Sequence, residues 1–240
     1  MELPAVVEHA GLVRAGEVGQ DDVAGAALRE ARADRGFVSA PGSSVGRPAV
    51  FLDRDGTLTV ESDWVRRPEE LVLLPGAAQA VAELARAGFL VVVVTNQSAV
   101  ARGMIDEREL AAIHARFEEL LAAGGARVDG IYFCPHHPTE GVGVYRRECA
   151  CRKPKAGLLV RAAEELGIEL ARSWVVGDAR RDLEAGARVG VRGVMVATGK
   201  GEREFEALVA EGGRVPFVPG VLEAARWIVG ASSVGSAGGG

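Results

Sequence analysis

The longest uninterrupted apolar run of the chain covers residues 89–94, which read Phe-Leu-Val-Val-Val-Val. A run of this kind predicts a central parallel strand that is covered on both faces. Shorter, mostly apolar segments predict four more strands, at 49–52, 128–133, 173–178 and 193–197. Helical patterns lie between and after them, at 77–87, 106–122, 156–166, 180–189, 202–210 and 221–229. This alternation predicts a Rossmann-like α/β fold with a mainly parallel sheet.

The ends of the chain differ in composition from this middle part. Residues 1–46 hold a helix-compatible segment and finish in a stretch rich in Ser, Gly and Pro, which predicts an extension that is partly disordered. Residues 231–240 are mostly Gly and Ser and predict a flexible tail. We therefore expect one catalytic domain at 47–230.

Length, composition and net charge argue against some classes of binding partner. The chain has 240 residues, of which 48% are hydrophobic, and this is enough for a real core. Its formal net charge of −5 argues against a nucleic-acid or anionic-membrane partner. No apolar run approaches the roughly 20 residues of a membrane span. We expect a cytoplasmic, soluble protein, a monomer, with a small-molecule substrate.

Two carboxylates, Asp53 and Asp55, follow directly after the first predicted strand. Side chains two apart on an extended segment point the same way, and two close negative charges repel unless a cation lies between them. This favours a divalent metal. Gly56 allows a tight turn, and Thr57 adds a hydroxyl group. The alternative is a strand end with two solvated acids.

Polar groups also follow the second and fourth predicted strands. Thr95 can give a phosphate oxygen its hydroxyl and its backbone N–H, and Asn96 can orient a reacting oxygen. Ser98 is either a substrate contact or the N-cap of the next helix. Asp178 can complete a magnesium site with Asp53 and a backbone carbonyl of Asp55. Asp182, one helical turn on, would orient the loop or a metal-bound water.

The loop after the two carboxylates can overhang the same pocket, although a solvated loop explains its polarity equally well. Its candidate substrate contacts are Glu61, Ser62, Asp63 and Trp64. Arg102 is as consistent with a surface role as with a substrate contact.

The three cysteines of the chain, Cys134, Cys149 and Cys151, lie within one short region. An odd, clustered set without an export signal indicates metal ligation rather than disulfides. With His136 they complete a closed tetrahedral shell for structural Zn²⁺. His137 is the weaker choice of fourth ligand, and free cysteines are the alternative to any metal.

Two cations follow the last cysteine. Lys153 can neutralise a phosphoryl group and Asp53, and Arg152 can grip a second anion bidentately. Fixing both from the adjacent zinc loop would preorganise them.

These strand-end residues together resemble the motif set of the haloacid dehalogenase superfamily of phosphatases, over residues 48–200. The resemblance implies that Asp53 is the nucleophile and Asp55 the general acid and base. It also implies bound Mg²⁺, helices on both faces of the sheet and no large cap domain, so that the loop at 61–64, the turn at 95–98 and Arg152 select the substrate.

Within that superfamily, the zinc loop and Thr-Asn-Gln-Ser at 95–98 are similar to D-glycero-D-manno-heptose 1,7-bisphosphate 7-phosphatases. The related histidinol-phosphatases share the zinc loop, but an Asp-Gly-Leu-Gly type segment follows their Asn-Gln, where this chain has Ser98. Bisphosphatases of this group often carry Lys after the metal-binding Asp, and this chain has Ala179 there.

The resemblance therefore implies removal of the 7-phosphate of the heptose bisphosphate through an aspartyl-phosphate. Histidinol phosphate or another small sugar phosphate is the first alternative substrate. Nucleic-acid end repair would need a basic groove or an added domain, which the acidic charge argues against. A zinc-stabilised binding module without catalysis is disfavoured because the full set of catalytic residues is present.

Overall fold

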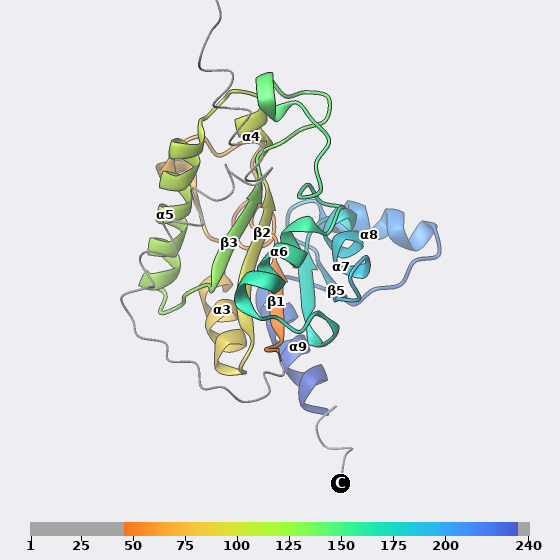
Figure 1. Cartoon of the computed structure of the whole chain (residues 1–240). Helices are drawn as coiled ribbons and strands as arrows, with labels where there is room; N and C mark the ends of the chain where they lie inside the picture. Colours follow the sequence, from red (N-terminus) through yellow and green to blue (C-terminus); the bar gives the residue numbers. More distant parts are fainter. Residues whose placement is uncertain (1–45, 235–240) are drawn as a thin grey trace, which may run out of the picture. The chain divides into compact units, whose positions relative to one another are not determined.

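A computed structural model describes residues 46–234, which belong to one compact unit. Its centre is a six-stranded sheet in the order β3-β2-β1-β4-β5-β6, and every pairing is parallel (Figure 1). The strands are β1 (Ala49–Leu52), β2 (Leu90–Asn96), β3 (Gly130–Cys134), β4 (Trp174–Gly177), β5 (Arg192–Val196) and β6 (Phe217–Val218). The first five confirm the sequence prediction. Strand β6 was not predicted because two residues carry no periodic pattern.

Strand β1 lies in the middle of the sheet. Phe51 pairs with Val92 of β2 on one side and with Val175 of β4 on the other. All four residues of β1 are fully buried, as expected for a parallel strand covered on both faces. The carboxyl end of β1, where Asp53 follows, is therefore flanked by the ends of two neighbouring strands.

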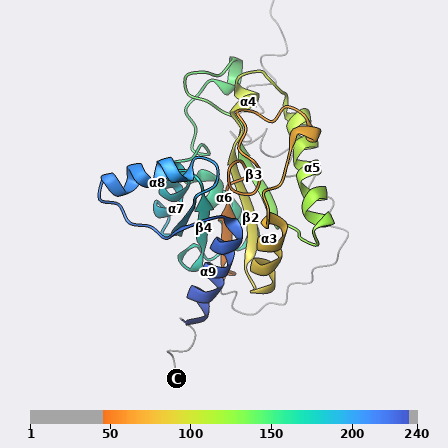
Figure 2. The same ribbon diagram turned by 180° about the vertical axis from the view of Figure 1, so that it is seen from behind.

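Helices cover both faces of the sheet. Helices α3, α5 and α9 lie on one face and α6 and α7 on the other, with α8 beside α7 (Figures 1 and 2). The helices are α3 (Ala77–Arg86), α4 (Ser98–Ala101), α5 (Glu107–Ala123), α6 (Gly157–Leu166), α7 (Arg180–Ala187), α8 (Gly201–Ala210) and α9 (Val221–Val234). Short 3-10 turns occur at η1 (Pro68–Glu70), η2 (Gly143–Tyr145) and η3 (Leu170–Arg172). The helices on both faces confirm the expected architecture.

Local sequence signals explain where several helices begin and end. Asp106 accepts a hydrogen bond from the backbone N–H of Glu109, whose carboxylate accepts one from Asp106 N, so a capping box starts α5. Gly167 ends α6 in the left-handed conformation, with φ of +65°.

The predicted C-terminal boundary needs a correction. Helix α9 continues to Val234, four residues into the segment predicted as a flexible tail at 231–240. Gly230 does not adopt a positive φ, so nothing at this position breaks the helix. The remainder of the predicted tail, and the predicted extension at 1–46 apart from Gly46, lie outside the described residues.

The connections after the strands are short between residues 46 and 234. A loop, η1 and α3 join β1 to β2, and α4 and α5 join β2 to β3. No insertion large enough to form a lid occurs in this part of the chain, as expected. None of the helices described here has the length and apolar character needed to cross a membrane.

Candidate active site

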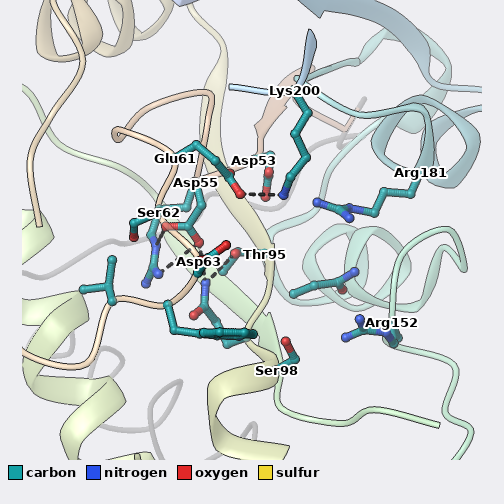
Figure 3. Close-up of a pocket in the computed structure, with 15 residues that line it drawn as sticks. Asp53, Asp55, Glu61, Ser62, Asp63, Thr95, Ser98, Arg152, Arg181 and Lys200 are labelled. Carbon is teal, nitrogen blue, oxygen red and sulfur yellow. Dashed lines mark hydrogen bonds and ion pairs between the residues drawn. The ribbon is translucent and has the colours of Figure 1, made fainter. Parts of the chain in front are cut away.

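A pocket of about 230 Å³ opens at the carboxyl ends of the strands (Figure 3). In an open parallel sheet this edge is the usual place for a ligand. The residues that line the pocket are Asp53, Arg54, Asp55, Glu61, Ser62, Asp63, Trp64, Val65, Thr95, Asn96, Gln97, Ser98, Arg152, Arg181 and Lys200. All predicted substrate contacts are among them except Lys153, which is buried and contacts Asp53.

Asp53 and Lys153 form the centre of the site. The Lys153 ammonium lies 2.7 Å from Asp53 Oδ1 and 2.7 Å from Asp182 Oδ1, and it donates to the Val94 carbonyl at 2.6 Å. Burial raises the pKa of Asp53 to about 6, although Lys153 acts in the opposite direction. Burial alone would lower the pKa of Lys153, but Asp182 and Asp53 outweigh it and raise this pKa. Lys153 is therefore a fixed positive charge beside the nucleophile candidate.

Two predicted substrate contacts have a further structural role around Lys153. The Asn96 side chain accepts from Lys153 N at 3.0 Å and donates to the Lys153 carbonyl at 3.1 Å. Arg152 donates to the backbone carbonyl of His136 at 2.9 Å. The turn after β2 and the cysteine region thus both fix the backbone that carries the two cations.

Asp55 is held by its own set of partners. Arg54 donates two hydrogen bonds of 3.0 Å to its carboxylate, and Gln97 Nε2 donates one of 2.8 Å. Burial would raise the pKa of Asp55, but Arg54 and the hydrogen bonds from Gln97 and Thr59 lower it overall. Gln97, predicted to bind substrate, therefore also positions this carboxylate.

A group of three buried carboxylates, Asp53, Asp178 and Asp182, has ligand oxygens within 4.8 Å of one another. The Asp55 side chain is not in this group, so only its backbone carbonyl is left for the metal role that the sequence suggested for Asp55. Asp178 Oδ1 is buried and has no hydrogen-bond partner among the described residues. Burial and the neighbouring charge of Asp53 raise the pKa of Asp178 to about 7. An oxygen-lined, strongly anionic group of this kind fits a hard divalent cation.

Two glycines make close approach to Asp178 possible. A Cβ added to Gly56 or to Gly199 would lie 2.2 Å from Asp178 Oδ2, and both residues have a positive φ, of +85° and +62°. Asp178 Oδ2 accepts a hydrogen bond from the backbone N–H of Lys200 at 2.9 Å. Only glycine fits at positions 56 and 199. This explains why a glycine follows Asp55 in the Asp-x-Asp-Gly-Thr motif.

The loop after β1 lines the pocket, which is one of the two alternatives that the sequence left open, although Ser62 and Asp63 are also exposed. Glu61 pairs with Lys200 at 2.5 Å, and Ser62 and Asp63 line the pocket beside it (Figure 3). Trp64 lies under the guanidinium of Arg102, 5.1 Å from the ring centroid. Arg102 also pairs with Glu140 of the cysteine region, so it links this region to the loop.

The cysteine region places four side chains together: Cys134, His136, Cys149 and Cys151. Their sulfur atoms lie 3.3 to 3.5 Å apart, and His136 Nδ1 lies 3.7 Å from Cys134 Sγ and 3.4 Å from Cys151 Sγ. Tetrahedral zinc with ligands at about 2.3 and 2.0 Å would have edges of roughly 3.5 to 3.8 Å. His137 is not in the cluster, since its Nδ1 accepts from the backbone of Thr139 and Glu140.

Four pocket residues were not predicted from the sequence: Arg54, Val65, Arg181 and Lys200. Lys200 had a usable signal, because it lies in the polar loop that follows β5 and so shares the strand-end position of the other site residues. Arg181 had none, since an arginine in the first turn of a helix is ordinarily a surface residue. Asp182 accepts from the backbone N–H of Ala179, in line with the expectation that it orients the loop, and it also contacts Lys153.

Known proteins provide an independent comparison. A family model described as HAD-hydrolase-like matches residues 150–224. The chain is 46% identical over 163 residues to the D-glycero-beta-D-manno-heptose-1,7-bisphosphate 7-phosphatase of Pseudomonas putida, covering 68% of this chain and 89% of the relative. It is 39% identical over 184 residues to the enzyme of that name from Escherichia coli K12, covering 76% and 88%.

A solved structure has a similar fold. The D,D-heptose 1,7-bisphosphate phosphatase from B. bronchiseptica, crystallised with magnesium and phosphate, aligns with a TM-score of 0.67 at 37% identity. The alignment covers 77% of this chain and 99% of that protein. Sequence and fold therefore agree, and the chain belongs to the D-glycero-beta-D-manno-heptose-1,7-bisphosphate 7-phosphatase family of haloacid dehalogenase-like phosphatases.

Proposed function

We propose that this protein removes the 7-phosphate of D-glycero-β-D-manno-heptose 1,7-bisphosphate through an aspartyl-phosphate on Asp53. The observation that carries the proposal is the 2.7 Å contact between Lys153 and Asp53, two residues 100 positions apart that meet beside the pocket. Family membership and the names of the relatives support the choice of substrate.

The reaction assigned to these residues has two steps. First, an Asp53 carboxylate oxygen attacks phosphorus, and the oxygen that leaves with the sugar takes a proton from Asp55. Next, Asp55 takes a proton from water, whose oxygen attacks the same phosphorus and releases phosphate and free Asp53. Lys153 balances the negative charge in both steps. In the substrate-free structure Arg54 stabilises ionised Asp55, which is the form needed as a base in the second step.

Two metal ions belong to this proposal. Asp53 and Asp178, with the Asp55 carbonyl, would hold Mg²⁺, which when bound offsets the negative charge of the phosphoryl group and the carboxylates. Unpartnered Asp178 Oδ1 supports this assignment. The cysteine–histidine cluster would hold structural Zn²⁺ and so brace the segment that leads into Arg152 and Lys153.

The test of the substrate is phosphate release from the β anomer of the heptose bisphosphate with Mg²⁺, beside its α anomer, histidinol phosphate and fructose 1,6-bisphosphate. We expect the β-heptose substrate to give the highest kcat/KM, by about tenfold or more, because a small open pocket selects through specific polar contacts. Equal, weak turnover of all four would contradict the substrate assignment while leaving a phosphatase.

The stabilisation that Mg²⁺ provides should depend on pH. The folded-state pKa values of about 6 for Asp53 and about 7 for Asp178 lie above the ordinary value of 3.8, so both native carboxyls retain protons that the unfolded chain has lost. Ionising them destabilises the metal-free fold as the pH rises through these values. Mg²⁺ competes with these protons and is favoured once they are gone.

We therefore expect Mg²⁺ to raise the unfolding midpoint little near pH 5 and increasingly up to about pH 8. Thermal unfolding with Mg²⁺ and with a chelator, across this range, measures the difference. Asp178→Asn should remove most of the pH dependence of the Mg²⁺-induced increase in the unfolding midpoint. An equal Mg²⁺ effect at both ends of the range would contradict the assigned ligands.

A further inference from the structure

Arg181 lines the pocket and has a buried N–H donor without an acceptor among the described residues. It comes from the first turn of α7 and reaches into the pocket from the same side as Lys200 and Arg152 (Figure 3). This donor is the guanidinium Nε. Burial alone would lower the pKa of Arg181, but the charges of Asp182 and Asp53 outweigh it and raise this pKa. The charge of Arg181 is thus balanced by nearby carboxylates, but a buried N–H donor without an acceptor is costly, and an anion in the pocket would supply one.

The other cations around the pocket have partners already. Arg54 is paired with Asp55, Lys200 with Glu61, and Lys153 with Asp53 and Asp182. Lys153 therefore serves the phosphoryl group that reacts at Asp53. Arg181 also lowers the pKa of Asp53 through its charge, but within residues 46–234 it forms no hydrogen bond or ion pair with that carboxylate.

Arg181 and Arg152 are close enough to affect each other. Burial lowers the pKa of Arg152, and the charge of Arg181 acts in the same direction. Arg152 uses one amino group on the His136 carbonyl, which leaves the rest of its donors for the pocket. Two guanidinium groups facing one small pocket repel each other, and an anion between them would turn this repulsion into attraction.

We propose that Arg181, together with Arg152, binds the second phosphoryl group of the substrate, the one that is not hydrolysed. This inference rests on the proposed function and identifies the residues that favour a bisphosphate over a monophosphate. A phosphate monoester presents three anionic oxygens that can accept hydrogen bonds from two guanidinium groups, whereas a neutral hydroxyl offers a single, weaker acceptor.

The arrangement also accounts for Ala179. A side chain at this position is almost fully enclosed, and its backbone N–H donates to Asp182 Oδ2 at 3.1 Å. A cation placed two residues later, at Arg181 in the first turn of α7, lines the pocket. The chain thus has a positive charge next to the metal-binding aspartate although the position directly after it is Ala.

The test compares kcat/KM for the heptose 1,7-bisphosphate with that for the heptose 7-phosphate, in the full-length protein with Mg²⁺. For Arg181→Ala we expect the ratio of the two values to fall by about 10- to 100-fold, mainly through KM of the bisphosphate. Arg181→Lys should have a ratio between those of the wild type and Arg181→Ala, because an ammonium group keeps the charge but cannot donate two parallel hydrogen bonds as a guanidinium group does. Arg180→Ala is the matched control, because Arg180 pairs with Glu211 on the surface, and the ratio should not change.

The outcomes separate this inference from the proposed function. A wild-type protein without preference for the bisphosphate would refute the substrate itself. If the wild type prefers the bisphosphate and Arg181→Ala keeps the same preference, the proposed role of Arg181 is overturned. This also holds if kcat/KM falls equally for the bisphosphate and the 7-phosphate, since Arg181 would then act on the reacting phosphate or on the carboxylates. If Arg181→Ala does not fold, Arg181→Gln, which preserves length and polarity, supplies the same ratio.

Discussion

Asp53→Asn should reduce phosphatase turnover by about 10,000-fold or more, because it removes the atom that attacks phosphorus. The loss should be in kcat, whereas the protein remains folded. Ionised Asp53 is unfavourable in the native state, as its raised pKa indicates, so a neutral amide removes that cost. Lys153 keeps Asp182 and the Val94 carbonyl as partners. Steady-state phosphate release and thermal unfolding together measure both parts of this prediction.

Asp63→Asn is the control for this experiment. It makes the same chemical change in the same pocket, but Asp63 is exposed and lies outside the carboxylate group that contains Asp53. We expect an effect below about tenfold. Wild-type turnover in Asp53→Asn would exclude the nucleophile assignment and with it the aspartyl-phosphate.

His136→Ala should have the largest effect on stability. Structural zinc sites contribute roughly 10–16 kcal/mol of apparent binding free energy, and losing one of four ligands forfeits much of it. We expect less than one bound zinc per chain and a fall in the unfolding midpoint of about 10 °C or more. Turnover should also decrease, because Arg152 donates to the carbonyl of this same residue. Elemental analysis and thermal unfolding provide the two readouts.

The next residue supplies a matched control. His137 is a neighbouring imidazole that stays outside the cysteine cluster. His137→Ala should therefore retain zinc and most of the stability. If His136→Ala and His137→Ala lose zinc equally, the choice of fourth ligand is wrong, and if neither variant nor the wild type binds zinc, the structural metal is wrong.

The sequence predicted the sheet well because its strands are buried on both faces and its helices are amphipathic. It also predicted that residues at strand ends would meet, since parallel strands end at one edge. Asp53, Thr95 and Asp178 follow this rule, and the structure brings Asp53 and Asp178 together. The choice of His136 over His137 stays a prediction, which is supported by the position of His136 in the cluster with the three cysteines.

What the sequence could not provide is which way each side chain at the strand ends points. Asp53 and Asp55 line the same pocket, as expected, but Arg54 and Gln97 hold the Asp55 carboxylate, which lies outside the group of three carboxylates. Asn96 was expected only at the substrate, yet it holds the Lys153 backbone. These contacts join residues far apart in the chain, and they depend on loop conformations that no periodicity encodes. Arg181 is the extreme case, since only the fold shows on which side of α7 it lies.

The order of strands in the sheet has a consequence for biosynthesis. Strand β1 is made first but needs β2 and β4 as neighbours, and Thr198 Oγ1 closes the site with a hydrogen bond to the Gly56 carbonyl, 142 residues earlier. A nascent chain therefore cannot assemble the carboxylate pocket until β5 and the following loop have left the ribosome. Until β2 emerges, β1 is an apolar segment without its strand partners, and a chain that stops before residue 198 has most of the candidate catalytic residues but lacks the contact of Thr198 with Gly56.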